Sequence, residues 1–152
     1  MKTILLYICL TLSFSSNHFK NNNYIKLPNS TEKTTKIYDS LYVKLTVYWP
    51  NISQCDSTPL QTASLKTIDT NKVKSGRQKW VAISPNLHVR YGGSLKFGDT
   101  IKIHSKNKKI KGNWIVQDLS SPKNKNSIDI LQMPGGYYGK LNSVKITYSN
   151  VL

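Results

Sequence analysis

The chain has 152 residues, which suits one folded domain with appended segments. It carries 22 Lys and Arg against 7 Asp and Glu, and a formal net charge of +15 suits anionic surroundings such as nucleic acid, acidic lipid headgroups or a cell wall. Outside an N-terminal leader the only cysteine is Cys55, which excludes an internal disulfide and an all-cysteine metal site. Cys55 itself is expected to be a small buried thiol.

Residues 1–16 have the pattern of a secretory signal peptide. Lys2 precedes an apolar run over residues 4–12, and small residues at 13–16 offer a cleavage site. The run is too short to span a bilayer as a stable helix. We therefore expect an exported protein that is periplasmic, associated with the outer membrane or extracellular. Removal of the leader takes away Lys2 alone and leaves a net charge of 15 − 1 = +14.

Residues 17–41 are rich in Asn, Lys, Ser and Thr without an apolar period, so we expect a flexible tether. From residue 42 to 150 the pattern is that of short β-strands, predicted at 43–49, 79–84, 99–105, 113–117, 128–131 and 144–148. Residues 84–90 are expected to carry a helical turn, and a lysine-rich hairpin tip is expected at 106–111. Six short strands in one domain predict an all-β fold, a small closed six-stranded barrel.

Three aspartates, Asp99, Asp118 and Asp129, stand out because carboxylates are scarce. Strand parity places Asp99 with the apolar residues Ile101 and Ile103, and it places Asp118 with the apolar side of its own strand. Asp129 lies between two isoleucines. If the three carboxylates converge, repulsion and burial raise the pKa of at least one, as a general acid requires. The alternative is that Asp99 and Asp118 are turn residues that bind backbone N–H groups.

Short pieces of sequence around these aspartates resemble the 3D domain, a family named for three aspartates that occurs in membrane-bound lytic transglycosylase A and in small stationary-phase survival muralytic proteins. The resemblance covers about residues 43–133, and the step of eleven residues from Asp118 to Asp129 is its most specific spacing. The pieces lie at 46–48, 54–59, 62–64, 79–87, 97–100, 114–118 and 127–129.

The resemblance implies a double-psi β-barrel that cleaves the β-1,4 bond between N-acetylmuramic acid and N-acetylglucosamine in peptidoglycan, with a 1,6-anhydro product. It implies that Asp129 is the general acid and base, that Asp118 and Asp99 support it, and that Tyr48, Thr62 and Ala63 line the substrate groove. The expected partner is the peptidoglycan glycan strand, bound by a monomer without a cofactor. Peripheral contact with an anionic wall or membrane surface is also expected.

The chain departs from the larger transglycosylases between the second and third aspartates. Residues 119–127 contain two lysines, Lys123 and Lys125, and no glycine. The second domain of those enzymes is absent from the resemblance as well.

Other readings stay open at this point. His88 and His104 have no ligand spacing, so no metal is expected, although three aspartates can in principle bind Mg²⁺ or Ca²⁺. A non-catalytic wall-binding module of the expansin and rare lipoprotein A type, and a hydrolytic muramidase, are the main alternatives. A nucleic-acid-binding barrel would suit the charge, but the leader argues against it.

Overall fold

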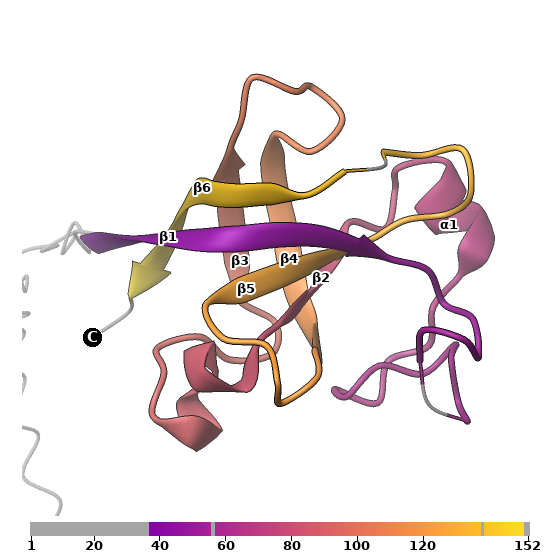
Figure 1. The fold of residues 1–152 in the computed structure, drawn as a ribbon, viewed down its shortest axis with the longest axis horizontal. Helices are drawn as coiled ribbons and strands as arrows, with labels where there is room; N and C mark the ends of the chain where they lie inside the picture. The colour runs from indigo at the N-terminus through magenta and orange to yellow at the C-terminus, as the bar shows by residue number, and fades with distance from the viewer. Residues whose placement is uncertain (1–36, 56, 138, 151–152) are drawn as a thin grey trace, which may run out of the picture. The chain divides into compact units, whose positions relative to one another are not determined.

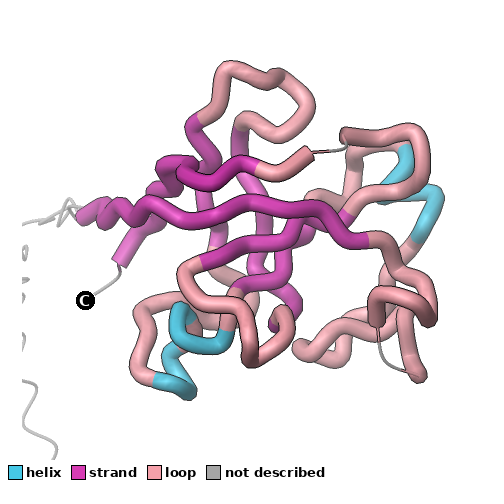
Figure 2. The backbone as a smooth tube through the Cα atoms, viewed as in Figure 1, coloured by secondary structure: helices cyan, strands magenta, loops and turns pink. Residues whose placement is uncertain are grey.

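The computed structural model describes residues 37–55, 57–137 and 139–150. The expected leader and most of the expected tether lie outside these residues. The described part contains six strands and little helix (Figures 1 and 2), which confirms the predicted all-β class. Its elements are β1 (Ile37–Tyr48), α1 (Thr70–Lys74), β2 (Trp80–Ile83), two 3₁₀ turns (Pro85–Leu87 and Val89–Tyr91), β3 (Thr100–His104), β4 (Gly112–Leu119), β5 (Ser127–Leu131) and β6 (Leu141–Asn150).

The six strands form one sheet, in the order β1, β5, β2, β4, β3, β6. Each strand pairs with two others, because β6 also pairs with β1. Two of the pairs, β1 with β5 and β2 with β4, are parallel, and the other four are antiparallel. Each strand therefore has a ladder partner on both sides along part of its length (Figure 1), whereas the first residues of β1 pair with β6 alone.

β1 is longer than its apolar pattern predicted. It begins at Ile37, so residues 37–41 belong to the strand although the sequence placed them in the tether. They pair with β6 in an antiparallel ladder, for example Ser40 with Thr147. The side chains of Tyr38 and Ser40 are exposed, which explains why no apolar alternation marks this stretch: the backbone ladder holds it, and burial does not.

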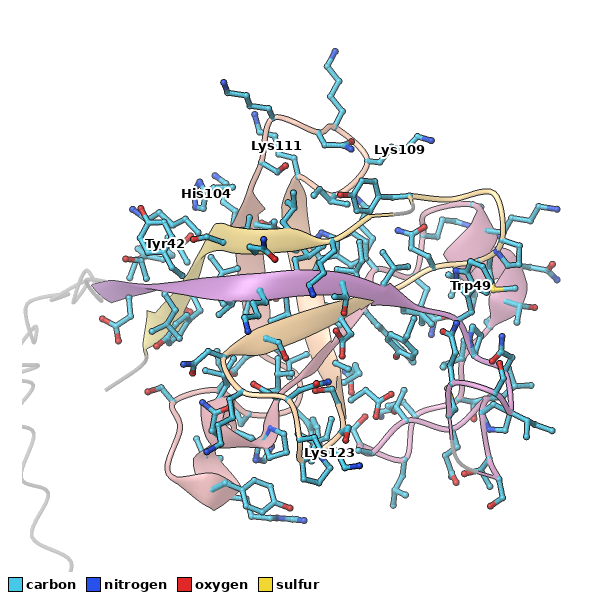
Figure 3. The ribbon with its side chains drawn as sticks, viewed as in Figure 1. Tyr42, Trp49, His104, Lys109, Lys111 and Lys123 are labelled. Carbon is cyan, nitrogen blue, oxygen red and sulfur yellow. The ribbon has the colours of Figure 1, made fainter. Side chains whose placement is uncertain are left out.

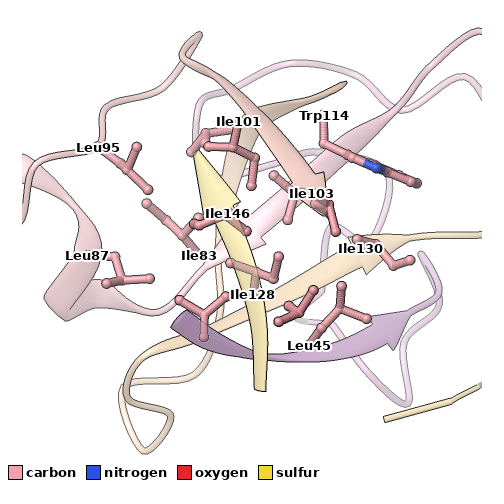
Figure 4. Close-up of a cluster of buried hydrophobic side chains, with 14 of the residues drawn as sticks. Leu45, Ile83, Leu87, Leu95, Ile101, Ile103, Trp114, Ile128, Ile130 and Ile146 are labelled. Atoms are coloured by element: carbon pink, nitrogen blue, oxygen red, sulfur yellow. The ribbon is translucent and has the colours of Figure 1, made fainter. Parts of the chain in front are cut away.

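The core consists of the inward-facing residues of all six strands (Figure 4). It confirms the predicted alternation, since each strand contributes every second residue. Branched aliphatic side chains dominate, as expected for a pleated surface buried on one face. The strand residues that belong to this core are Val43, Leu45, Val81, Ile83, Ile101, Ile103, Trp114, Val116, Ile128, Ile130, Val144, Ile146 and Tyr148.

A smaller apolar cluster lies on the outer side of the sheet beneath α1. Ile68, Val73 and Leu131 are buried there, with Tyr48 and Trp80 packed against them. α1 was not predicted, because five residues are too few to show a helical period. Its N-cap is Asp69, whose Oδ1 accepts hydrogen bonds from the N–H groups of the second and third helical residues, at 3.0 and 3.1 Å. The segment from residue 60 to 78 is thereby packed onto the outer face.

Within the described ranges, no helix has the length and apolar character needed to cross a membrane.

Candidate active site

The strand registers place four side chains in one row across four neighbouring strands. Thr46 on β1 is paired with Asp129 on β5, Asp129 with Ala82 on β2, and Ala82 with Asp118 on β4. Laterally paired residues point to the same face of a sheet. The row therefore lies on the outer face, where Ala82 separates the two aspartates. Adjacent strands are about 4.8 Å apart, so the backbones of Asp118 and Asp129 are about 10 Å apart.

Asp118 reaches this row through an irregularity that sequence parity did not predict. Val81 pairs with Val116, but the next residue, Ala82, pairs with Asp118, so β4 has an extra residue at this point. The extra residue reverses the alternation. Asp118 therefore faces outward beside Ala82, and the prediction that it shares the apolar side with Trp114 and Val116 is wrong.

The carboxylate of Asp118 is held by three donors. Its Oδ1 accepts hydrogen bonds from the main-chain N–H groups of Ala63 and Leu119, both at 2.9 Å, and its Oδ2 accepts one from the Tyr48 hydroxyl at 3.1 Å. Hydrogen bonds to the charged form of a carboxyl group stabilise that form. Asp118 is thus a fixed negative charge at the end of β4.

Asp129 has a different environment. It lies between Ile128 and Ile130, which are fully buried, while its own side chain is half-buried on the opposite face. Burial raises the pKa of Asp129 above its ordinary value, and the negative charge of Asp118 raises it further. The hydroxyls of Thr46 and Ser120 lower the pKa of Asp129 and so offset part of this increase. Thr46 Oγ1 donates a hydrogen bond to Asp129 Oδ1. The net result is a carboxyl group that keeps its proton more readily than a surface aspartate.

Tyr48 lies at the end of β1, and its ring packs against the outer apolar cluster. Burial strongly raises the pKa of its hydroxyl, and the charge of Asp118 and the hydrogen bond to it raise it further. The hydroxyl therefore stays protonated and remains a donor to Asp118. Tyr48 therefore lies beside Asp118 and lines the same cavity.

The loop that contains Thr62 and Ala63 is tied to the end of β4. Beyond the Ala63 contact with Asp118, Ser64 Oγ donates to Gln117 Oε1 at 2.5 Å and Ser64 N–H to the Gln117 carbonyl at 3.2 Å. Thr62 is buried, and its Oγ1 accepts a hydrogen bond from Lys66 N–H at 3.2 Å. Thr62 thus shapes the loop from within, while Ala63 contacts the catalytic candidates through its backbone.

At the tip of this loop Leu65 has a backbone conformation that non-glycine residues rarely adopt, with φ of +62°. Its side chain is 75% exposed, and it lines the same cavity as the aspartates. A strained backbone that presents an apolar side chain to solvent is more common at binding sites than elsewhere. Leu65 therefore forms an apolar lip beside the two carboxylates.

These elements enclose a cavity of about 460 Å³, which is large enough for a small ligand or a few sugar atoms of a longer chain. Both Asp118 and Asp129 line this cavity. The other residues that line it are Tyr48, Gln54, Cys55, Thr58, Pro59, Gln61, Thr62, Ala63, Leu65, Ala82, Leu119, Ser120, Ser121 and Asn124.

Asp99 does not join the other two aspartates. It is half-buried in the turn before β3, where its Oδ2 accepts a hydrogen bond from Lys96 N–H at 2.9 Å. The described residues that line the cavity do not include it, and Asp99 does not contribute to the raised pKa of Asp129. The alternative reading of Asp99, a turn residue that binds the backbone, is the one that the geometry favours.

The connection from β4 to β5 reaches Asp129 without a glycine. Asn126 adopts the left-handed conformation, with φ of +49°, which asparagine tolerates better than most residues. Its side chain forms a paired contact with Asn86: Asn86 Nδ2 donates to Asn126 Oδ1 at 2.7 Å, and Asn126 N–H donates to Asn86 Oδ1 at 3.1 Å. Asn126 therefore adopts the left-handed conformation that a glycine would otherwise supply, directly before β5 begins at Ser127.

The lysines of the chain do not form a single stripe in the described part. Figure 3 shows Lys109 and Lys111 on the connection between β3 and β4, the predicted hairpin tip, while Lys123 lies at the opposite end of the fold. A continuous basic stripe is the usual footprint of nucleic-acid binding. The distribution is instead that of a basic surface spread over several faces.

No group of three His, Cys, Asp or Glu side chains in residues 37–55, 57–137 and 139–150 is arranged to hold a metal ion. His88 is buried against Phe97, with ring centroids 4.6 Å apart, and its Nδ1 accepts a hydrogen bond from Arg90 N–H. His104 lies on β3, where its Nε2 contacts Thr147 Oγ1 at 3.0 Å. The two histidines belong to separate parts of the fold.

The sequence-based prediction gave no role to Thr46, which donates to Asp129, or to the cavity residues Ala82, Ser120 and Leu65. Thr46 and Ala82 could have been found only from the register, because nothing in the sequence shows which strands are neighbours. Cys55 also lines the cavity; it is half-buried, not fully buried as predicted, and its thiol donates to the Trp49 carbonyl at 3.4 Å.

A half-buried carboxyl group with a raised pKa, beside a carboxylate held by hydrogen bonds, can act as a general acid and then as a base. Neither a scan against protein-family models nor a search of the curated proteins returns a match to this chain. The chemistry of the cavity therefore carries the functional assignment, together with the resemblance described above.

Proposed function

We propose that the protein is a peptidoglycan lytic transglycosylase of the 3D-domain type. It cleaves the bond between N-acetylmuramic acid and N-acetylglucosamine and forms a 1,6-anhydro end. The observation that carries the proposal is the paired environment of Asp129 and Asp118: one carboxyl group with a raised pKa, and one carboxylate held by three hydrogen bonds, in the same cavity.

Asp129 acts twice in the proposed reaction. Its proton passes to the glycosidic oxygen as the bond to the anomeric carbon of the muramyl residue breaks, and the N-acetylglucosamine 4-hydroxyl leaves. The Asp129 carboxylate then takes the proton of the muramyl 6-hydroxyl as that oxygen bonds to the anomeric carbon. The proton balance closes without water, and Asp129 returns to its acid form.

Asp118 supports this reaction as a fixed charge. The transition state of glycosidic cleavage resembles an oxocarbenium ion, which a nearby negative charge stabilises. A hydrolytic enzyme needs a second carboxylate that activates water or attacks the sugar. The oxygens of Asp118 already accept three hydrogen bonds, two of them from main-chain N–H groups, which favours a supporting role over a second base.

Other parts of the proposal rest on the same resemblance. The six strands with their parallel pairs β1–β5 and β2–β4 are consistent with a closed double-psi β-barrel. Tyr48 and the loop at Thr62 and Ala63 would line the glycan groove. The protein would act as an exported monomer on glycan strands, without a cofactor, and its positive charge would favour contact with an anionic wall or membrane surface.

The test is to digest purified peptidoglycan with the mature protein and determine the masses of the soluble fragments. Transglycosylase products are lighter than hydrolysis products by one water molecule. Asp129→Asn should abolish them, because an amide cannot transfer the proton. Asp99→Asn is the matched control: it removes the same charge outside the cavity and should leave the products unchanged.

Three outcomes would contradict the proposal. Products with reducing ends would indicate a hydrolytic muramidase. Binding of peptidoglycan without any product would indicate a wall-binding module. Full activity in the Asp129→Asn variant would remove this residue from the mechanism.

A further inference from the structure

A second cavity, of about 590 Å³, lies on the outer face of β2 and β4. Its floor includes Trp80 on β2 and Ile115 on β4, which are paired with each other. Its wall is basic, with Lys72 and Arg77 from the region of α1 and Lys79 from the start of β2. No residue is shared with the cavity that holds Asp118 and Asp129.

The two cavities are neighbours along the strands. Trp80 precedes Ala82 by two residues, and Ile115 precedes Asp118 by three. At about 3.3 Å per residue, the floor of the second cavity begins about 7–10 Å from the row of the aspartates. The loop at residues 62–66 forms a ridge between them, because Ser64 is bonded to Gln117, and the exposed Leu65 is its tip.

The charges of the second cavity favour an anionic ligand. Three cationic side chains face one carboxylate, Asp69, whose Oδ2 is 3.5 Å from Lys72 Nζ. Arg77 Nε donates to Ser75 Oγ at 3.0 Å, which orients its guanidinium group, and Lys79 Nζ lies 5.6 Å from the centre of the Trp114 ring. The Lys79 ammonium lies over Trp114, which does not line this cavity, so Lys72 and Arg77 with Asp69 leave an excess of one positive charge beside the apolar surfaces of Trp80 and Ile115. A neutral sugar has no need of these cations.

We propose that this cavity binds the peptide stem of peptidoglycan through the free carboxylates of the stem. The inference rests on the proposed function, because the stem is attached to the muramyl residue whose bond would be cleaved at Asp129. An extended peptide advances about 3.3–3.6 Å per residue, so two or three stem residues span the distance between the cavities. The stem would pass the exposed Leu65, and its carboxylates would meet Arg77 and Lys72.

The experiment measures binding to two polymers immobilised on beads: intact peptidoglycan, and the glycan strands that an amidase releases from it by removing the stems. The full mature protein with Asp129→Asn is used, so that neither polymer is cut. Binding to the intact polymer should be about fivefold tighter than binding to the stripped glycan. In the same background, Lys72→Gln with Arg77→Gln should abolish this preference and leave binding to the stripped glycan within twofold.

The matched control is Lys108→Gln with Lys111→Gln, which removes the same charge from the connection between β3 and β4. It should keep the preference for the intact polymer. Equal binding of the two polymers by the Asp129→Asn protein would overturn the proposal. So would a control variant that loses its preference for intact peptidoglycan as fully as the Lys72→Gln, Arg77→Gln variant does. So would displacement of the protein from intact peptidoglycan by duplex DNA at physiological salt, since it would mark the cavity as a general polyanion site. The protein that retains Asp129 can be tested separately for cleavage of the stripped glycan, which measures the lytic activity without any stem. A failure of the proposed activity can therefore be distinguished from a failure of the proposed stem site.

Discussion

Replacing Thr46 by valine isolates the one hydrogen bond that a side chain on β1 donates to Asp129. Valine keeps the branched shape that suits a strand and removes only the hydroxyl. A hydrogen bond to a charged group contributes about 1.5–3 kcal/mol. Because Asp129 is half-buried and not fully enclosed, we expect the lower end, a loss of about 1.5 kcal/mol in the free energy of unfolding at pH 7.

The loss should depend on pH in a defined direction. Burial raises the pKa of Asp129 in the folded protein above its ordinary value of 3.8. Below pH 3.8 the carboxyl group is protonated in both the folded and unfolded states, so the hydroxyl of Thr46 faces a neutral acid and contributes less. As the pH rises through the folded-state pKa, Asp129 becomes charged and its dependence on Thr46 grows. The cost of Thr46→Val should therefore be small in acid and largest above neutrality.

Urea unfolding followed by tryptophan fluorescence at pH 4 and pH 7 measures both effects, since the chain has three tryptophans. Thr46→Ser, which keeps a hydroxyl, should recover part of the loss. A double-mutant cycle with Asp129→Asn separates the contact from other effects of the valine. The hydrogen bond from Thr46 to Asp129 would be refuted if Thr46→Val lowered the free energy of unfolding equally in the protein with Asp129 and in the Asp129→Asn variant. An equal loss at pH 4 and pH 7 would refute it as well.

Three further predictions concern the same site and its supports. Tyr48→Phe should lower the free energy of unfolding by about 1.5 kcal/mol through loss of its bond to Asp118, whereas Tyr42→Phe, on an exposed part of β1, should change it by less than about 0.5 kcal/mol. Asp129→Asn should stabilise the protein at pH 7, because it removes the cost of a half-buried charge, and the gain should fade as the pH falls toward 3.8; a constant gain would contradict the raised pKa. Asn126→Ala should destabilise by about 1–2 kcal/mol, and Asn126→Gly by less, since glycine accepts the left-handed backbone; equal losses in thermal unfolding would instead indicate that only the side-chain contact with Asn86 matters.

The strands could be predicted because their signal is local. Alternation of apolar and polar residues in 99–105 and 144–148 identified β3 and β6 within a few residues, and the side chains expected in the core are buried. α1 and the first residues of β1 lacked that signal. The first is too short for a helical period, and the second is held by backbone pairing with β6 and exposes alternate side chains.

The unequal roles of the three aspartates show how far sequence alone reaches. The sequence showed that Asp129 lies between two apolar residues, and its neighbours Ile128 and Ile130 are buried in the core while its own side chain is half-buried. Asp99 and Asp118 could not be separated in this way. Each lies at the end of a strand, and parity treated them alike.

The difference between them comes from contacts between strands that are distant in the chain. An extra residue in β4 turns Asp118 outward, and the pairing of β4, β2, β5 and β1 brings it beside Ala82, Asp129 and Thr46. The Asp99 carboxylate instead accepts a hydrogen bond from Lys96 N–H in its own turn. A chain's alternation specifies which side chains share a face of one strand. Which faces meet depends on register and neighbour order, and these are decided by pairing between strands that are distant in the chain.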